Sequence, residues 1–124
     1  MVRAQVNDFP EFVRNPTNKI AAESQHRRDI EGYVFDGADG SQACFWKCFR
    51  DRESATHRHE FDEYMLVVQG EYTVIIGENR FRLLPGQEFL IPKGVTHGGE
   101  CVAETRTIHV FGGRRAKRAI EVNI

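Results

Sequence analysis

The pattern of apolar and polar residues changes near Gly32. From there on, short apolar or alternating runs, each the length of a strand, are separated by turns rich in glycine and proline. The runs carry β-branched and aromatic residues, and none before the C-terminal tail repeats with the 3.6-residue period of a helix. This spacing is typical of an antiparallel sandwich or barrel. The sequence therefore predicts an all-β domain with strands at 32–36, 43–50, 64–69, 72–76, 80–84, 88–91 and 105–111.

The first thirty residues have a weaker pattern. The residues Phe9 to Val13 favour the start of a short helix, which Pro16 would end within one turn. No repeat, low-complexity tract or Ser/Pro-rich linker divides the chain, so we predict a single domain. It would consist of an irregular or partly helical N-terminal extension packing on the barrel (1–31), the barrel itself (32–112) and a basic C-terminal tail (113–124).

Length and charge narrow the classes of function. A chain of 124 residues fits one ordinary core, and 40% hydrophobic with 28% charged residues is typical of a globular protein. The net charge of −1 gives no general attraction to nucleic acid or to an anionic membrane. No apolar run approaches the roughly 18 residues that span a bilayer, and the N-terminus lacks the apolar segment of a secretory signal. We expect a cytoplasmic protein with no nucleic-acid or membrane partner.

Four basic residues cluster in the tail, at Arg114, Arg115, Lys117 and Arg118. A nucleic-acid or phosphate patch is one interpretation, but four charges make a weak electrostatic footprint. The favoured alternative is a solvated terminal segment that packs on the barrel or on a partner subunit.

The three cysteines do not form a recognisable disulfide framework, because their number is odd and their spacing irregular. Within one extended run the Cα atoms of Cys44 and Cys48 would lie about 13 Å apart, which is beyond disulfide reach. We therefore interpret the cysteines as small buried thiols of a reducing compartment.

The segment HRHEFDEYMLVVQG carries the most distinctive chemistry. On a strand, His57 and His59 would point to the same face. On a straight strand Glu63 would lie about 20 Å from the first histidine, so the chain must bend between Glu60 and Asp62 to bring it back. We interpret the carboxylates of Glu60 and Asp62 as those of solvated turn residues. Two imidazoles and one carboxylate would form a transition-metal site if a further ligand arrives from elsewhere.

That ligand is predicted in the segment GQEFLIPKGVTHGGE. Two turns, at Pro85-Gly86 and Pro92-Lys93-Gly94, enclose one short strand, and the second turn delivers His97 to the start of the next strand. His97 is therefore the natural partner of the first cluster.

Together these segments resemble the two motifs of the cupin superfamily. The first, H-x-H, three residues, E, six residues, G, is filled by His57, His59, Glu63 and Gly70. The second, G-x5-P-x-G-x2-H, is filled by Gly86, Pro92, Gly94 and His97. Two positions depart from the pattern: Asp51 stands where the family usually has glycine, and Cys101 where it has asparagine. Neither position is a ligand in the family.

The resemblance implies a small single-domain cupin, a double-stranded β-helix (jelly-roll) barrel that binds one divalent metal in its mouth. By resemblance, the ligands are His57, His59, Glu63 and His97. Iron or manganese is the first expectation, and nickel, zinc and copper also suit these ligands. In the alternative, the histidines line a polar barrel interior and bind nothing. A homodimer formed through the outer sheets is also implied.

Other residues are candidates for the pocket. On the strand 105–111, Thr107, His109 and Phe111 share a face with Thr105, and His109 could act as an acid/base or as a donor to a metal ligand. A simple hydrogen-bonded strand histidine is the alternative. Phe111 and Trp46 would suit the wall of a small-molecule pocket, with core packing as the alternative. Which face of 43–50 lines the pocket stays open.

The function we expect is a metal-dependent enzyme acting on a small oxygen-rich molecule, by dioxygenase-type or isomerase-, epimerase- or lyase-type chemistry. The alternative is a non-catalytic cupin module that binds a small molecule or a metal.

Overall fold

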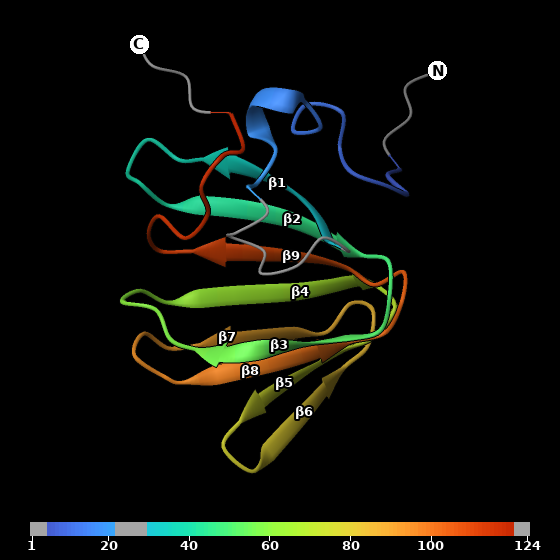
Figure 1. Ribbon diagram of the computed structural model, residues 1–124, viewed down its shortest axis with the longest axis vertical. Coiled ribbons are helices and arrows are strands. Elements are labelled where there is room, and N and C mark those ends of the chain that lie inside the picture. The colour runs from blue at the N-terminus through green and yellow to red at the C-terminus, as the bar shows by residue number, and fades with distance from the viewer. Residues whose placement is uncertain (1–4, 22–29, 121–124) are drawn as a thin grey trace.

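Strands are the main secondary structure of the described residues, as the pattern of apolar residues predicts. The computed structural model describes residues 5–21 and 30–120 (Figure 1). Within these ranges lie nine strands: β1 (Ile30–Asp36), β2 (Gln42–Cys48), β3 (Arg52–His57), β4 (Glu63–Gln69), β5 (Tyr72–Ile76), β6 (Asn79–Leu83), β7 (Glu88–Ile91), β8 (His97–Cys101) and β9 (Arg106–Phe111). The prediction of an all-β protein is confirmed.

Two of these strands, β3 and β8, have no counterpart among the apolar runs. β3 reads RESATH and β8 reads HGGEC, so neither has the alternating apolar residues that reveal a half-buried strand. They pair with each other, and β8 also pairs with β5. Their strand conformation therefore depends on partners far away in the sequence.

The strands form two antiparallel sheets. One has the order β1-β2-β9-β4-β7 and the other β3-β8-β5-β6. Met65 and Val67 of the five-stranded sheet meet Val74 and Leu83 of the four-stranded sheet in a buried core. Apolar side chains thus fill one part of the space between the sheets, and a second buried cluster includes Cys44 and Phe111.

The N-terminal helix lies later than the sequence predicts. Residues 11–13 form a turn, and the only helix among the described residues is the 3-10 helix η1 (Pro16–Asn18). Pro16 begins this helix instead of ending one, because a proline in the first turn sacrifices no hydrogen bond there. The Asn15 side chain caps η1 by accepting a hydrogen bond from Thr17 N at 2.9 Å. Ahead of it, Phe9 and Val13 pack against Tyr33 of β1.

The described part of the C-terminal tail, residues 113–120, packs on the barrel. Ala116 is buried in a cluster with Val34, and the Gln42 side-chain oxygen accepts hydrogen bonds from the backbone N–H groups of Arg115 and Ala116. Arg118 forms an ion pair with Asp36. These contacts support the interpretation of the basic residues as part of a segment packed on the barrel.

The outer face of the five-stranded sheet carries an exposed apolar row. Phe35, Ala43, Val110, Tyr64 and Leu90 lie opposite one another on five adjacent strands, so their side chains share a face. Phe35 and Leu90 are 50% and 58% exposed. This row suits the homodimer that the resemblance implies, and the dimer stays a prediction.

In the described part of the chain, no helix has the length and apolarity needed to cross a membrane.

Candidate metal centre

The bend that the sequence requires lies between β3 and β4. β3 ends at His57, the chain bends at Glu60 and Phe61, and Glu63 begins β4. The expectation that His57 and His59 share one strand is wrong, because pairing with β8 stops at His57. His59 lies in the loop instead, where its carbonyl accepts a hydrogen bond from Gly94 N at 2.8 Å. The loop, rather than strand alternation, therefore positions the second imidazole.

His97 arrives from the other motif. It is the first residue of β8 and lies directly opposite His57 of β3, with ring centroids 4.4 Å apart. Glu63 belongs to the facing sheet, where it is paired with Ile91 and Phe111. The structure thus brings together all four residues of the predicted ligand set, and one potential ligand atom of each lies within 4.8 Å of the others.

The distances within this cluster suit a metal ion. Glu63 Oε1 lies 3.2 Å from His97 Nε2 and 3.3 Å from His59 Nε2. Ligand atoms about 2.1 Å from an ion are about 3.0 Å apart at right angles and about 4.2 Å apart across it. All three atoms are buried, and within the described chain none has a hydrogen-bond partner. A buried polar atom left in this state costs about 1–3 kcal/mol, which coordination would offset. The cluster could therefore hold a metal ion.

Backbone carbonyls orient two of the imidazoles. Nδ1 of His57 lies 2.8 Å from the Ala55 carbonyl, and Nδ1 of His97 lies 2.9 Å from the Val95 carbonyl. Because a carbonyl only accepts, each Nδ1 carries the proton and each Nε2 presents a lone pair. This is the arrangement that metal-binding histidines use.

Glu63 is held by a fifth residue, His109 of β9. The carboxylate Oε2 accepts a hydrogen bond from His109 Nδ1 at 2.7 Å, and His109 Nε2 lies 3.0 Å from Thr107 Oγ1. Burial alone would raise the pKa of the Glu63 carboxyl. The hydrogen bond from His109, with the adjacent imidazoles, outweighs burial and holds that pKa well below its usual range. Glu63 is therefore ionised, with Oε1 directed at the histidines.

The pKa values of the two opposed histidines, His57 and His97, are shifted in opposite directions. Burial lowers the pKa of His57. Burial also acts to lower the pKa of His97, but the adjacent Glu63 carboxylate outweighs it and raises that pKa. The Glu63 carboxylate is therefore the cause that separates the pKa of His97 from that of His57.

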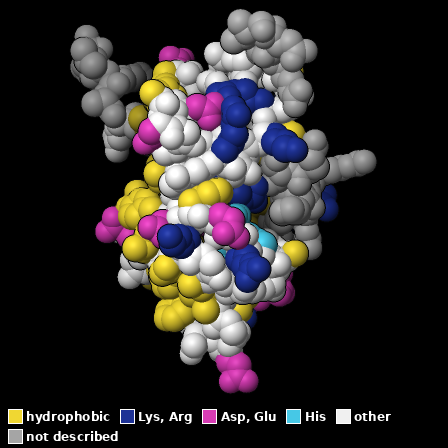
Figure 2. Space-filling view, turned by 90° about the vertical axis from the view of Figure 1, so that its left-hand side faces the viewer, with side chains coloured by type: hydrophobic (Ala, Val, Ile, Leu, Met, Phe, Trp, Pro, Cys, Tyr) yellow, Lys and Arg dark blue, Asp and Glu magenta, His cyan; other side chains and the backbone are white. Residues whose placement is uncertain are grey.

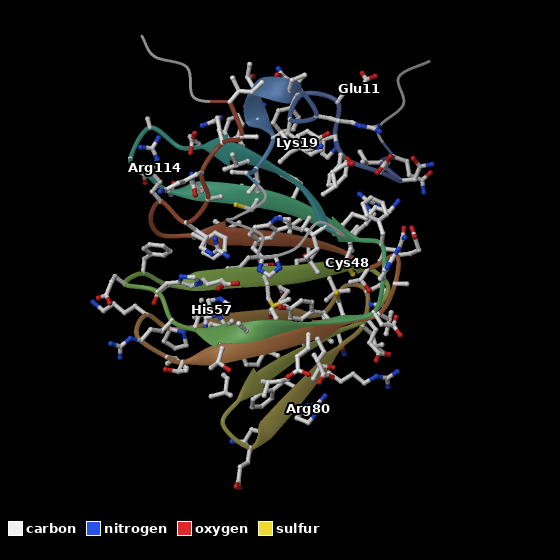
Figure 3. The ribbon with its side chains drawn as sticks, in the orientation of Figure 1. Glu11, Lys19, Cys48, His57, Arg80 and Arg114 are labelled. Carbon is white, nitrogen blue, oxygen red and sulfur yellow. The ribbon has the colours of Figure 1, made fainter. Side chains whose placement is uncertain are left out.

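A cavity of about 90 Å³ adjoins the cluster, a size that admits only a small ligand. In Figure 2, histidine atoms are visible in an opening bordered by basic and acidic side chains. His57 and Cys48 lie toward opposite ends of the space between the sheets (Figure 3). Trp46 and Cys48 line the cavity, so this face of β2 is the one that meets the site. Thr105 and the β9 residues Thr107, His109 and Phe111 also line the cavity.

Aromatic rings enclose the imidazoles. The Trp46 ring meets His109 edge-on, with centroids 4.9 Å apart, and Phe61 stacks on His59 with centroids 5.4 Å apart and planes 2° apart. Phe111 packs against His59 and His109. Phe111 is therefore both a buried core residue and a wall of the cavity.

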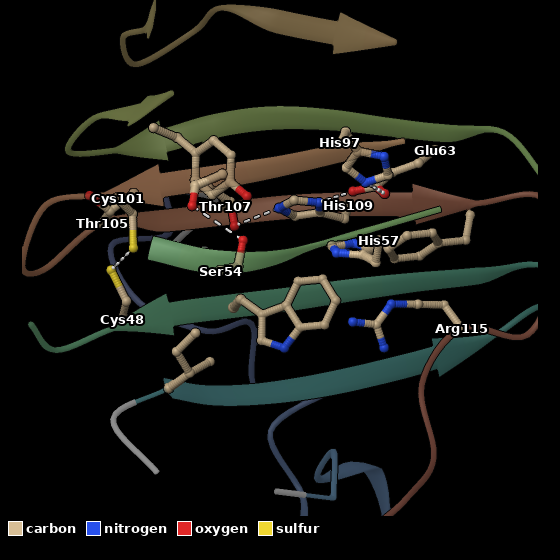
Figure 4. Close-up of a pocket in the computed structure, with 15 residues that line it drawn as sticks. Cys48, Ser54, His57, Glu63, His97, Cys101, Thr105, Thr107, His109 and Arg115 are labelled. Carbon is tan, nitrogen blue, oxygen red and sulfur yellow. Dashed lines mark hydrogen bonds and ion pairs between the residues drawn. The ribbon is translucent and has the colours of Figure 1, made fainter. Parts of the chain in front are cut away.

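Sequence reasoning missed several residues that line the cavity, above all Arg115 and the pair Cys48 and Cys101. Figure 4 shows Arg115 beside His57, although the sequence places it in an undistinguished basic tail. The glycine at position 113 was the available signal, because a Cβ there would clash with the Phe61 ring and glycine lets the chain pass close to it. Cys101 was visible as a departure from the motif, without indicating a partner.

Comparisons with known proteins agree with this architecture. The family model described as "Cupin domain" matches residues 50–111. The chain is similar in structure to KdgF from Halomonas sp., with 28% identity, a TM-score of 0.64, and coverage of 70% of this chain and 81% of that one. A cupin superfamily protein from Desulfitobacterium hafniense matches at 12% identity and TM-score 0.64, over 87% of this chain and 97% of that one.

A third similar structure is the cupin domain of Cnp3 from Schizosaccharomyces pombe, at 13% identity and TM-score 0.61, covering 68% of this chain and 65% of that one. No curated protein matches the sequence significantly. The matching structures confirm the predicted jelly-roll fold.

Proposed function

The chain belongs to the cupin superfamily, and we propose that it is a metal-dependent enzyme acting on a small oxygen-rich molecule. One observation carries the proposal: Nε2 of His59, Oε1 of Glu63 and Nε2 of His97 are buried, converge, and have no hydrogen-bond partner in the described chain. Such atoms are costly unless an ion satisfies them. The cluster also adjoins a cavity with room for a ligand.

The proposed ligands are His57, His59, Glu63 and His97. Three imidazoles and one carboxylate on a six-coordinate ion leave two positions for substrate, and this mixed nitrogen and oxygen set favours iron or manganese as the first choice. A bound metal would supply Lewis-acid polarisation of a substrate oxygen or, if redox-active, oxygen chemistry.

The position of Arg115 favours a substrate that carries an anionic or strongly polar oxygen. Its guanidinium lies 5.9 Å from the centroid of the Trp46 ring, and its backbone N–H donates to Gln42 Oε1 at 2.7 Å. The cation is therefore held at the cavity wall, on the same side as His57 (Figure 4). A carboxylate or hydroxyl group of the substrate would be recognised there, while the rings of Trp46 and Phe111 contact its carbon atoms.

His109 acts, in this proposal, as a positioning residue. Both of its ring nitrogens are engaged, one by Glu63 and the other by Thr107. A proton transfer through His109 would first have to break one of these bonds. The same observation favours the second candidate, a cupin module that binds a small molecule without turning it over.

Elemental analysis of protein purified without chelator tests the metal. We expect close to one transition metal ion per chain, and loss of that metal in Glu63→Gln. Glu60→Gln is the matched control, because Glu60 is an exposed carboxylate in the loop that precedes Glu63. Metal content that is equal in both variants, or wild-type protein that refuses every metal offered, would contradict the proposal.

Reconstitution with Fe(II), Mn(II), Ni(II), Cu(II) and Zn(II), followed by small carboxylates and sugars with and without O₂, then separates the two candidates. Product formation that depends on the metal supports the enzyme. Ligand-dependent thermal stabilisation without turnover supports the binding module.

A further inference from the structure

Two thiols meet at the end of the cavity opposite Glu63 and Arg115 (Figure 4). The Sγ atoms of Cys48 and Cys101 lie 2.6 Å apart, with Cys101 as the donor, and both residues line the cavity. The two residues are 53 positions apart in the sequence and lie in different sheets. Neither residue is used by the proposed metal site.

The backbones around these thiols are already fastened to one another. Cys48 is the last residue of β2 and Cys101 the last of β8. The turn that follows Cys101 returns to β2, where Cys48 N donates to Thr105 O at 3.0 Å and Glu104 N donates to Cys48 O at 2.8 Å. Bringing the two sulfurs to the roughly 2.05 Å of a disulfide would therefore shift them by only about half an ångström, with no change in strand pairing.

We propose that Cys48 and Cys101 form a reversible intramolecular disulfide by exchange with a small-molecule disulfide. One thiol, as its thiolate, attacks the reagent, forms a mixed disulfide and releases one reagent thiol. The second cysteine then displaces the second reagent thiol. In total, two cysteine thiols and one reagent disulfide give one protein disulfide and two reagent thiols, so the protein is oxidised and the reagent reduced.

Cys101 is the thiol that attacks first. It is partly exposed, whereas Cys48 is 4% exposed. Cys101 also lines a second, surface groove with Asp51, Glu53 and Glu100, so reagent can approach it from outside the barrel. This groove is acidic overall, because two of its four carboxylates have no arginine partner among the described residues, whereas Arg80 pairs with Glu100 and Arg82 with Glu71. A cationic disulfide such as cystamine should therefore react faster than anionic oxidised glutathione.

The third cysteine takes no part. Cys44 is fully buried, and burial raises the pKa of its thiol to about 12, which makes it unreactive. A disulfide between the other two would join the five-stranded sheet to β8, the strand that begins with the proposed ligand His97.

The test incubates reduced protein with cystamine or oxidised glutathione, unfolds it, alkylates the remaining thiols and measures intact mass and peptide links. We expect one alkylated cysteine instead of three, a Cys48–Cys101 peptide, reversal by dithiothreitol, and a rise in Tm on the order of 10 °C. The Cys44→Ser variant should form the same link. Three thiols retained in excess reagent, a link through Cys44, or a link between two chains would overturn the proposal.

Single variants test the order of attack. Cys48→Ser should accumulate a stable mixed disulfide at Cys101, since no second thiol displaces the reagent. In Cys101→Ser, Cys48 should stay a thiol over the same time. A mixed disulfide that forms equally fast at both positions would refute Cys101 as the attacking residue.

Discussion

The hydrogen bond between His109 and Glu63 gives the sharpest test of the metal centre. The variant His109→Phe removes the donor that holds Glu63 Oε2 at 2.7 Å, yet keeps a ring of similar size. That ring would stay between Trp46 and Tyr72, whose centroids lie 4.9 and 6.0 Å from that of His109. The substitution therefore changes the bond to Glu63 with little change in packing.

The size of the effect follows from the kind of bond removed. A hydrogen bond to an ionised group contributes about 1.5–3 kcal/mol, and every 1.4 kcal/mol is a factor of ten in affinity. The bond is buried on both sides, so solvent screens it little. If the freed carboxylate turns away from the cluster in the metal-free variant, metal binding must reorient it. We expect His109→Phe to weaken metal binding by about 10–100-fold, the range typical for residues that orient metal ligands.

Competition with a chromophoric chelator measures the affinity, and thermal denaturation of the metal-free proteins checks that each variant is folded. His109→Gln is the matched control, because its amide can still donate to Glu63. It should retain most of the affinity. A folded His109→Phe protein that binds metal as tightly as the wild type would refute the role given to this bond, and equal losses in both variants would assign the effect to the ring.

Three further outcomes test the fold. Met65→Ala should lower the free energy of unfolding by about 2–5 kcal/mol in urea titrations, because Met65 is fully buried between the sheets. Gly70→Ala should cost at least about 1–3 kcal/mol in the same titrations, since Gly70 has φ of 83° and a Cβ there would lie 2.8 Å from Thr105 Cα. Burial would raise the pKa of the Asp36 carboxyl, but hydrogen bonds from Gln42 and Arg118 outweigh burial and lower that pKa. The ionised carboxylate therefore stabilises the fold above the unfolded pKa near 3.8, and this stabilisation is lost as the pH falls through the pKa of the folded state. Asp36→Asn should therefore cost about 0.5–1 kcal/mol at pH 7 and almost nothing well below pH 3, as read from unfolding across that range.

Local pattern predicted those parts of the fold that pack apolar side chains. The unbroken apolar run at 64–68 predicts β4, although the alternation that turns Glu63, Met65 and Val67 inward is visible only in the structure. β3 could not be found in the same way, since RESATH has no apolar face and is a strand because β8 pairs with it. The helix was misplaced for a related reason, because proline in the first turn and proline as a stop give similar sequences.

The same distinction applies to the site, where local patterns predicted some residues and not others. The spacing of His57, Glu63 and His97 was informative because each spacing is set by a bend or turn encoded locally. Arg115 and the Cys48–Cys101 pair lie at the cavity because of how the tail and the two sheets pack against each other. No local pattern contains that information, so only the structure could bring these residues to the cavity.

The placement of the two proposed linkages has a consequence for how the sandwich is held together. Apolar packing between Met65, Val67 and Val74 occupies only one part of the space between the sheets. The metal ligands join the sheets at the mouth, since His97 comes from one sheet and Glu63 from the other, and the thiol pair joins them at the far end. Anything that binds only the folded state adds its binding free energy to stability, about 4 kcal/mol at a thousandfold excess over Kd. Because β8 carries His97 at one end and Cys101 at the other, the two proposed linkages would tie this strand to the five-stranded sheet at both of its ends.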